Sequence, residues 1–302
     1  MGQVHTLIAL HGRDGAIARA EDKLDRQCVE TAYAVLSDEQ QRIGVMHAGF
    51  AMAALPHKDI QDTVWIRQGG SVKLRVESGV DASDVPVGVP FGSIARMILL
   101  YLQTEAVKTR SRDIELGRSM NHWLGTMGID NGGKTYRLVR EQSKRLSLCR
   151  LTFYRQTDNA TLVTNGSFVR DAILPTRASD QLQLWREAVR LDEGFYQSLI
   201  DHPMPVRETA IREIGHRSMA IDVYVWLAYR LHQLERPTPV SWAALYAQFG
   251  AGYAQLRQFR AKFKEPLSLA LAAYPEAQVA ADETGVTLYP SPSPVPQRQL
   301  IA

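Results

Sequence analysis

The 302-residue sequence has only two cysteines, Cys28 and Cys149. They lie far apart among apolar neighbours, and neither belongs to a C-x-x-C motif or stands beside a pair of histidines. This pattern favours two buried free thiols in a reducing cytosol. We therefore expect a cytoplasmic protein.

Long apolar runs and an excess of one charge are also missing. The longest apolar run near the start covers residues 6–10, which is too short for a signal peptide, and nothing approaches the roughly eighteen apolar residues of a membrane span. We expect no membrane association. Thirty-five Lys and Arg face thirty-two Asp and Glu, a net charge of +3. A surface that binds polyanions must therefore arise from clustering of cations.

Motifs that carry catalysis are scarce. There is no H-E-x-x-H, no G-x-S-x-G and no carboxylate cluster with ligand spacing. The eight histidines are never two residues apart, which excludes the usual metal-holding pair of a rolling-circle nickase. We predict no catalytic residue, no metal and no cofactor.

One nucleotide-binding pattern is complete: residues 128–135 match G-x-x-x-x-G-K-[ST]. A true phosphate-binding loop follows a buried strand, whose end directs the loop amides at the phosphates. The preceding segment, GRSMNHWLGTM, has helical spacing instead. We therefore interpret the pattern as a glycine turn before a basic helix and predict that the protein is not an enzyme.

The chain contains one order of elements twice. The first copy predicts an apolar helix at 93–107, a short helix with Trp123, a glycine turn, a basic helix at 134–149 and a hairpin at 150–166. The second predicts an apolar helix at 218–234, a short helix with Trp242, a turn at 250–252, a basic helix at 253–269 and a hairpin around 282–285. This is the order of a winged helix, and an offset of about 120 residues indicates a divergent duplication.

The predicted fold class is α+β, mainly helical, with tandem winged-helix domains, each a helix-turn-helix with a β-wing. Residues 1–85 should form N-terminal helices and a β-hairpin at 63–77, packed on the first winged helix. Winged-helix domains should cover residues 86–178 and 179–290, joined by a linker at 174–185. The proline-rich residues 291–302 should be a disordered tail.

The first basic helix is amphipathic on a helical wheel. Leu138, Val139, Gln142, Leu146 and Cys149 share one side, and most cations lie opposite. Only one anion, Glu141, interrupts five cations. The second basic helix repeats the pattern with less charge. The residues predicted to contact DNA are Lys134, Tyr136, Arg137, Arg140, Lys144, Arg145, Arg257, Arg260 and Lys264, with Arg137 and Arg140 at base edges.

Several segments together resemble one family, the plasmid-encoded RepA replication initiators of Gram-negative bacteria. The segments are VPFGSIARMILLYLQTEAV, ELGRSMNHWLG, NGGKTYRLVREQSKRL, FYQSLIDHPMPV, AIDVYVWLAYRL and FGAGYAQLRQFRAKF. The resemblance implies binding of double-stranded plasmid origin DNA, commonly at short direct repeats, opening of the duplex and recruitment of host replication proteins. It also implies control of copy number and repression of its own promoter.

Two other functions stay open on the residues alone: a transcriptional repressor without origin function, and a tandem winged-helix module that docks on proteins. A homodimer is a further open question. Apolar surface on residues 20–55 or on the hairpin could form its interface or could belong to the core.

Overall fold

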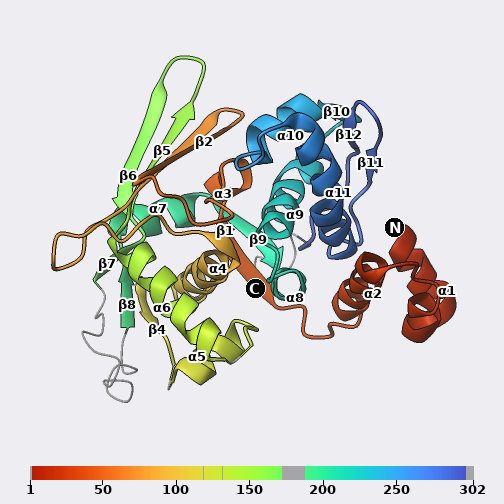
Figure 1. Cartoon of the computed structure of the whole chain (residues 1–302), viewed down its shortest axis with the longest axis horizontal. Coiled ribbons are helices and arrows are strands. Elements are labelled where there is room, and N and C mark those ends of the chain that lie inside the picture. Colours follow the sequence, from red (N-terminus) through yellow and green to blue (C-terminus); the bar gives the residue numbers. More distant parts are fainter. Residues whose placement is uncertain (1, 118, 131, 172–187, 297–302) are drawn as a thin grey trace. The chain divides into compact units, whose positions relative to one another are not determined.

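The computed structural model describes residues 2–117, 119–130, 132–171 and 188–296 (Figure 1). Helices make up about 47% and strands 21% of the structure, so helix predominates in a mixed fold. The chain divides into a terminal unit, residues 1–44 with 204–302, and a central unit, residues 45–203. It passes between them within β1 (Ile43–His47) and at the start of β9 (Pro203–Arg207).

The described residues of the central unit form two sheets and five helices. Besides the end of β1, its elements are α3 (Gly49–Met52), β2 (Val64–Gly69), β3 (Val72–Glu77), α4 (Gly92–Thr109), β4 (Asp113–Glu115), α5 (Met120–Thr126), α6 (Gly133–Leu148), β5 (Arg150–Gln156), β6 (Thr161–Ser167), β7 (Val169–Asp171), β8 (Ala188–Leu191) and α7 (Glu193–Asp201). The strand orders are β2-β3-β5-β6 and β4-β8-β7.

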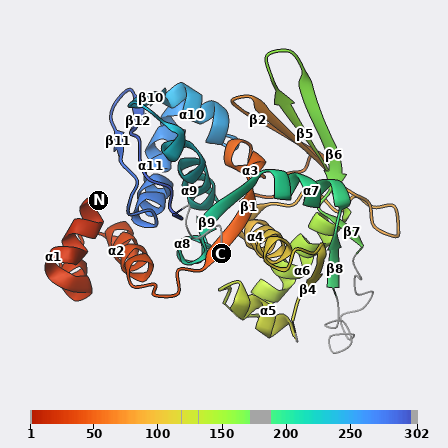
Figure 2. The same cartoon turned by 180° about the vertical axis from the view of Figure 1, so that it is seen from behind.

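The four-stranded sheet joins two hairpins that the sequence predicts. Pairing is antiparallel throughout, and β3 bridges the hairpins because it also pairs with β5. Alternation along β3 turns Val72, Leu74 and Val76 to the core, as expected for a sheet with one solvated face. The β5–β6 hairpin extends beyond the β2–β3 hairpin (Figures 1 and 2).

The terminal unit is mainly helical. Its elements, besides most of β9, are α1 (Gln3–Ile17), α2 (Lys23–Leu36), α8 (Glu208–Glu213), α9 (Ser218–Arg230), η1 (Leu231–Gln233), β10 (Thr238–Ser241), α10 (Trp242–Phe249), α11 (Leu256–Ala272), β11 (Val279–Ala281) and β12 (Gly285–Leu288). The three strands β10, β12 and β11 form an antiparallel sheet in that order. Helix α11 packs against α9, α10 and α2.

The two units do not coincide with the predicted boundaries at 85/86 and 178/179. Helices α1 and α2 belong with the second half of the chain: α2 packs on α8 and α11, and the buried His5 ring contacts the Ala272 carbonyl at 2.9 Å. The β2–β3 hairpin instead joins β5. Residues 1–85 therefore divide between the two units, since hydrophobic partners far along the chain decide where each part packs. The predicted linker, residues 174–185, lies wholly outside the described residues.

The predicted disordered tail is wrong for residues 291–296. The Ser291 amide donates to the Leu231 carbonyl at 3.2 Å, the Tyr274 hydroxyl donates to the Pro292 carbonyl at 2.6 Å, and Val295 is buried. These contacts satisfy backbone groups and bury an apolar side chain, which holds the prolines on the core. Residues 297–302 lie outside the described part.

Candidate nucleic-acid interface

The glycine pattern at residues 128–135 lies between two helices. Helix α5 ends at Thr126, and Gly128 has φ +68°, a left-handed conformation that glycine adopts without steric cost. Gly132 is the N-cap of α6. Because a helix and not a strand precedes the pattern, the loop lacks the strand that directs phosphate-binding amides in nucleotide hydrolases, as the spacing predicts.

One side of α6 is held by the core. Val139 and Leu146 are fully buried, and Gln142 is buried as well. The Gln142 side-chain oxygen accepts a hydrogen bond from the Phe91 amide at 2.8 Å, next to the start of α4, against which α6 packs. This packing fixes the rotation of α6 about its axis, so the opposite side must face solvent.

The solvent side of α6 carries cations and a tyrosine. Lys134 and Arg137 are exposed, and Tyr136 and Arg140 are half-buried. In the part of the chain that the structure describes, Lys134, Arg137 and Arg140 form no ion pair. The predicted contact residues are thus brought together on one face of the helix, without acids among them.

Arg145 does not belong to this face, contrary to the prediction. Its side chain is 10% exposed and donates to Asp59 at 2.6 and 3.1 Å, to Glu141 at 2.7 Å and to the Val89 carbonyl at 2.9 Å. Burial alone lowers the pKa of Arg145, but hydrogen bonds and charges of the two carboxylates outweigh burial and raise that pKa. Arg145 therefore holds the 59–91 segment against α6.

Arg145 also neutralises Glu141, the one acid of α6. Glu141 pairs with Arg145 four residues on, so its charge is compensated from within the helix. Glu141 therefore does not offset the charges of Lys134, Arg137 and Arg140 on the outer face.

Lys144 has an intermediate position. Its Nζ lies 3.0 Å from an Asp81 oxygen, and the side chain stays 43% exposed. The hydrogen bond from Lys144 lowers the pKa of Asp81, and the amides of Ser83 and Val85 add to the effect. Such exposed pairs contribute little energy, so Lys144 can exchange Asp81 for another anion at small cost.

Helix α11 presents the second predicted group. Arg257 and Lys264 are exposed, while the Arg260 guanidinium lies 5.6 Å from the centre of the Trp242 ring. Hydrogen bonds from the Thr284 hydroxyl and from the Thr284 and Gly285 amides lower the pKa of Asp282, and the charge of Arg260 adds to this. Phe259 and Phe263 anchor the opposite side in the core.

Two further residues of α11, Gln258 and Lys262, are exposed and were not among those predicted from the sequence. Gln258 lies in the first turn beside Arg257, and a glutamine amide can donate to and accept from an adenine edge. Its position at the start of a basic helix was a signal available in the sequence. Asp81 and Asp59, which neutralise cations of α6, carried no such local signal.

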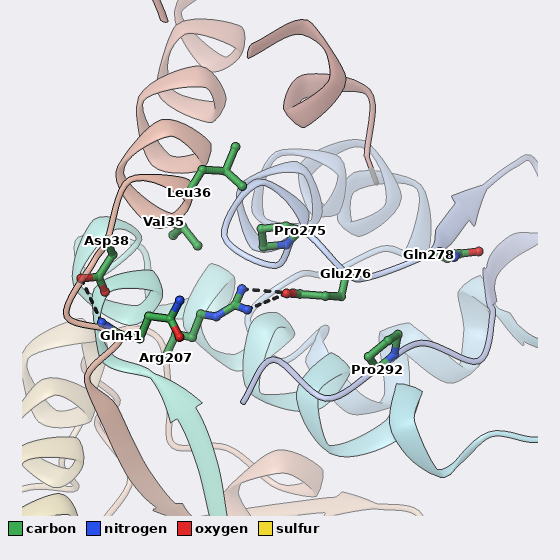
Figure 3. Close-up of a pocket in the computed structure, with 9 residues that line it drawn as sticks. All are labelled: Val35, Leu36, Asp38, Gln41, Arg207, Pro275, Glu276, Gln278 and Pro292. Atoms are coloured by element: carbon green, nitrogen blue, oxygen red, sulfur yellow. Dashed lines mark hydrogen bonds and ion pairs between the residues drawn. The ribbon is translucent and has the colours of Figure 1, made fainter. Parts of the chain in front are cut away.

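A cavity of about 440 Å³ lies elsewhere in the terminal unit (Figure 3). Its lining residues are Val35, Leu36, Asp38, Gln41, Arg207, Pro275, Glu276, Gln278 and Pro292. The guanidinium of Arg207 is paired with Glu276 by two hydrogen bonds of 3.0 and 2.5 Å. The strongest charges that line the cavity thus compensate each other, and we assign this cavity no part in the interface.

Among the described residues, the side chains and helices were compared with the requirements of a metal site and of a membrane span. No group of three or more His, Cys, Asp or Glu side chains there could hold a metal ion. None of the helices in these ranges has the length and apolar character needed to cross a membrane.

The fold is similar to that of RctB domains 2 and 3. A crystal structure of selenomethionine derivatives of these domains has a TM-score of 0.50 and 12% sequence identity, and the match covers 82% of this chain and 99% of that chain. A second structure of RctB domains 2–3 has a TM-score of 0.47 and 12% identity, over 79% and 93% of the two chains. At this identity the likeness shows the fold alone.

The family follows from the sequence. The model of the plasmid-encoded RepA protein family matches residues 89–243, just over half of the chain. The chain belongs to this family and is a plasmid replication initiator. The matched segment runs from just before α4 to the start of α10, so it includes all of α6. No curated protein matches the chain.

Proposed function

We propose that this initiator binds the DNA of its plasmid origin sequence-specifically, at direct repeats, with α6 and α11 as the recognition helices of two winged helices. One observation carries the proposal: the outer face of α6, which carries Lys134, Arg137 and Arg140. Each is without an ion pair in the described ranges, while the other side of the helix is packed.

The chemistry of this face suits a major groove. A guanidinium reaches the O6 and N7 atoms of guanine with two hydrogen bonds, and Arg137 and Arg140 have that role in the proposal. Lys134 and Tyr136 lie in the first turn of α6, where helix amides also attract phosphate. Lys144 contacts phosphate after leaving Asp81.

The terminal unit supports a second recognition helix. Arg257, Arg260 and Lys264 lie on one side of α11, and the antiparallel sheet of β10, β12 and β11 stands where a β-wing would follow the helix. In the central unit the β5–β6 hairpin follows α6 directly and occupies the corresponding position of a β-wing. Arg260 is held by Trp242, which suits a phosphate contact at a fixed position.

The remaining functions also belong to the proposal. The protein opens the origin duplex, recruits host replication proteins, controls copy number and represses its own promoter in the cytoplasm, and it does so without enzymatic activity. A homodimer is compatible with direct repeats, since two copies would occupy neighbouring sites. The location of a phosphate-loop pattern between two helices supports the absence of nucleotide hydrolysis.

Fluorescence anisotropy tests the proposal directly. The full chain is titrated against duplexes tiled across the flanks of its own gene and against shuffled duplex, over a series of salt concentrations. We expect one repeated segment to bind about a thousandfold more tightly than shuffled DNA, with a steep negative salt slope. Equal binding to every segment, or none, would contradict origin recognition and favour a protein-docking module.

A further inference from the structure

The four-stranded sheet of the central unit has one face in the core and one toward solvent, although Thr152 on the outer face is only 7% exposed. Leu74 and Val76 are fully buried, and Leu151 and Phe153 are 2% and 7% exposed. Residues between them in sequence point the other way, because side chains alternate along a strand. The solvent face therefore consists of a defined set of side chains from β2, β3, β5 and β6.

Register places one row of these side chains across all four strands. Gln68 pairs with Lys73, Lys73 with Tyr154, and Tyr154 with Val163. The Lys73 ammonium lies 5.5 Å from the centre of the Tyr154 ring, which confirms that both project from the same face. A cation beside an aromatic ring thus occupies the middle of the sheet.

The neighbouring rows add cations and apolar surface. Arg75 and Arg150 belong to the same face, and Glu77 is its one acid; Arg75 lies 3.0 Å from Glu77. Exposed apolar side chains lie at the end of the row and beside it: Val163, in the row, is 50% exposed, and Ile66, in the next row, is 46% exposed. The face is positive overall, and the row that holds Tyr154 has no carboxylate.

We propose that this sheet face, which we call the β-platform, binds single-stranded DNA. Proteins bind single strands by stacking bases on aromatic side chains while cations follow the backbone. Tyr154 offers a ring for one base, Ile66 and Val163 offer apolar contact to neighbouring bases, and Lys73, Arg75 and Arg150 pair with phosphates. Strands about 4.8 Å apart give four strands a width that suits two or three nucleotides.

The charges and the aromatic ring of the β-platform favour single-stranded DNA over two other ligands, duplex DNA and an acidic protein. An intact duplex hides its base faces and would leave Ile66, Tyr154 and Val163 without apolar contact. An acidic protein would pair with the cations but has no need of a ring at their centre. The inference extends the proposed function, because an opened origin is where a RepA-family initiator meets single strands.

The test uses the full chain and a fluorescein-labelled (dT)15 oligonucleotide, which forms no duplex with itself. Tyr154→Ala and Lys73→Ala should each weaken binding about fivefold or more, while Tyr154→Phe keeps it. For Lys73→Ala, which lies in β3 outside the proposed β5–β6 wing, binding of origin duplex should change less than about twofold, since α6, α11 and the wing are unaltered. Circular dichroism and thermal melting check that the variants fold.

The terminal unit offers a matched control. Tyr33 is 40% exposed, and the Arg13 guanidinium lies 5.8 Å from its ring centre, so this pair also sets a cation beside an exposed ring on a helix, although Arg13 is paired with Glu30. Tyr33→Ala should leave (dT)15 binding unchanged. If it weakens binding as much as Tyr154→Ala, the effect is not specific to the β-platform and the proposal is wrong.

Two further results would overturn the proposal: no binding of (dT)15 by the unaltered protein at low salt, or equal losses on (dT)15 and duplex from folded Lys73→Ala. Failure of the proposed function gives a different result. In that case origin and shuffled duplex bind alike, while the variants still lower the affinity for (dT)15, and the β-platform stands by itself.

Discussion

Helices α6 and α11 occupy the same place in the order of elements, yet they use their cations differently. Helix α6 has five cations in sequence, but Arg145 is buried and Lys144 is paired with Asp81. Helix α11 has four, and Arg257, Lys262 and Lys264 are all exposed. The two helices therefore present similar numbers of cations to solvent. A count of charges along a helix overestimates what it offers to DNA when acids from distant segments contact it.

The largest effect is expected for Arg145, the cation of α6 that is buried. Arg145→Ala should lower the free energy of unfolding of the central unit by about 2–4 kcal/mol, because it leaves Asp59, Glu141 and the Val89 carbonyl without their donor. Urea unfolding followed by circular dichroism measures it. Arg140→Ala, on the exposed side, is the control and should change stability by less than about 0.5 kcal/mol. A stable Arg145→Ala protein with weakened DNA binding would return Arg145 to the interface.

The next effect compares one arginine of each helix. Arg137→Ala should weaken binding of the cognate duplex by about 1–3 kcal/mol and lower discrimination against random DNA, because a bidentate contact to guanine is lost. Arg257→Ala should cost a comparable amount if α11 also enters a groove. Anisotropy on cognate and shuffled duplexes separates the two cases. Losses from Arg137→Ala that are equal on both duplexes would remove it from the base-reading residues.

A smaller effect on DNA affinity should distinguish Lys134 from Lys144, which is paired with Asp81. Lys134→Ala and Lys144→Ala should each weaken all sequences alike, since phosphate contacts carry no sequence information. Lys144→Ala should have the smaller effect, because Lys144 must first leave Asp81. The logarithmic salt slope should become shallower by about 0.9 for Lys134→Ala and by less for Lys144→Ala. The reverse order would mean that Asp81 does not restrain Lys144.

The smallest effect is expected when the ion pair between Asp81 and Lys144 is removed. Asp81→Asn keeps the side-chain oxygen that accepts from the loop amides of Ser83 and Val85 and removes the charge that holds Lys144. Affinity for shuffled duplex at low salt should rise about two- to threefold. Asp84→Asn, in the same loop, makes the same change of charge at an exposed position and should have less effect. Equal gains from both would assign the change to net charge.

Much of the fold was predictable because it depends on local periodicity. Apolar spacing located α4, α6, α9 and α11, and alternation around a glycine turn located the β2–β3 hairpin. The helical wheel also placed Val139 and Leu146 in the core and Arg137 in solvent, as observed. These properties follow from 3.6 residues per helical turn and two per strand repeat.

The partners of these elements were not predictable in the same way. Lys134 and Arg145 lie near each other on the wheel, but Lys134 stands exposed at the helix start while Arg145 meets Asp59, 86 residues away in sequence. Helices α1 and α2 pack on α8 and α11 for the same kind of reason. Single-sequence periodicity does not encode which distant segment covers a given face.

The sequence by itself determined the order of the elements, the amphipathic character of α6 and α11, and the resemblance to the RepA family. Tertiary structure alone decided which cations stay available, that residues 291–296 pack on the core, and that Lys73 and Tyr154 meet in the middle of one sheet face. The reason is physical: periodicity acts between near neighbours, whereas the burial and pairing of a charge depend on residues that only folding brings within a few ångströms.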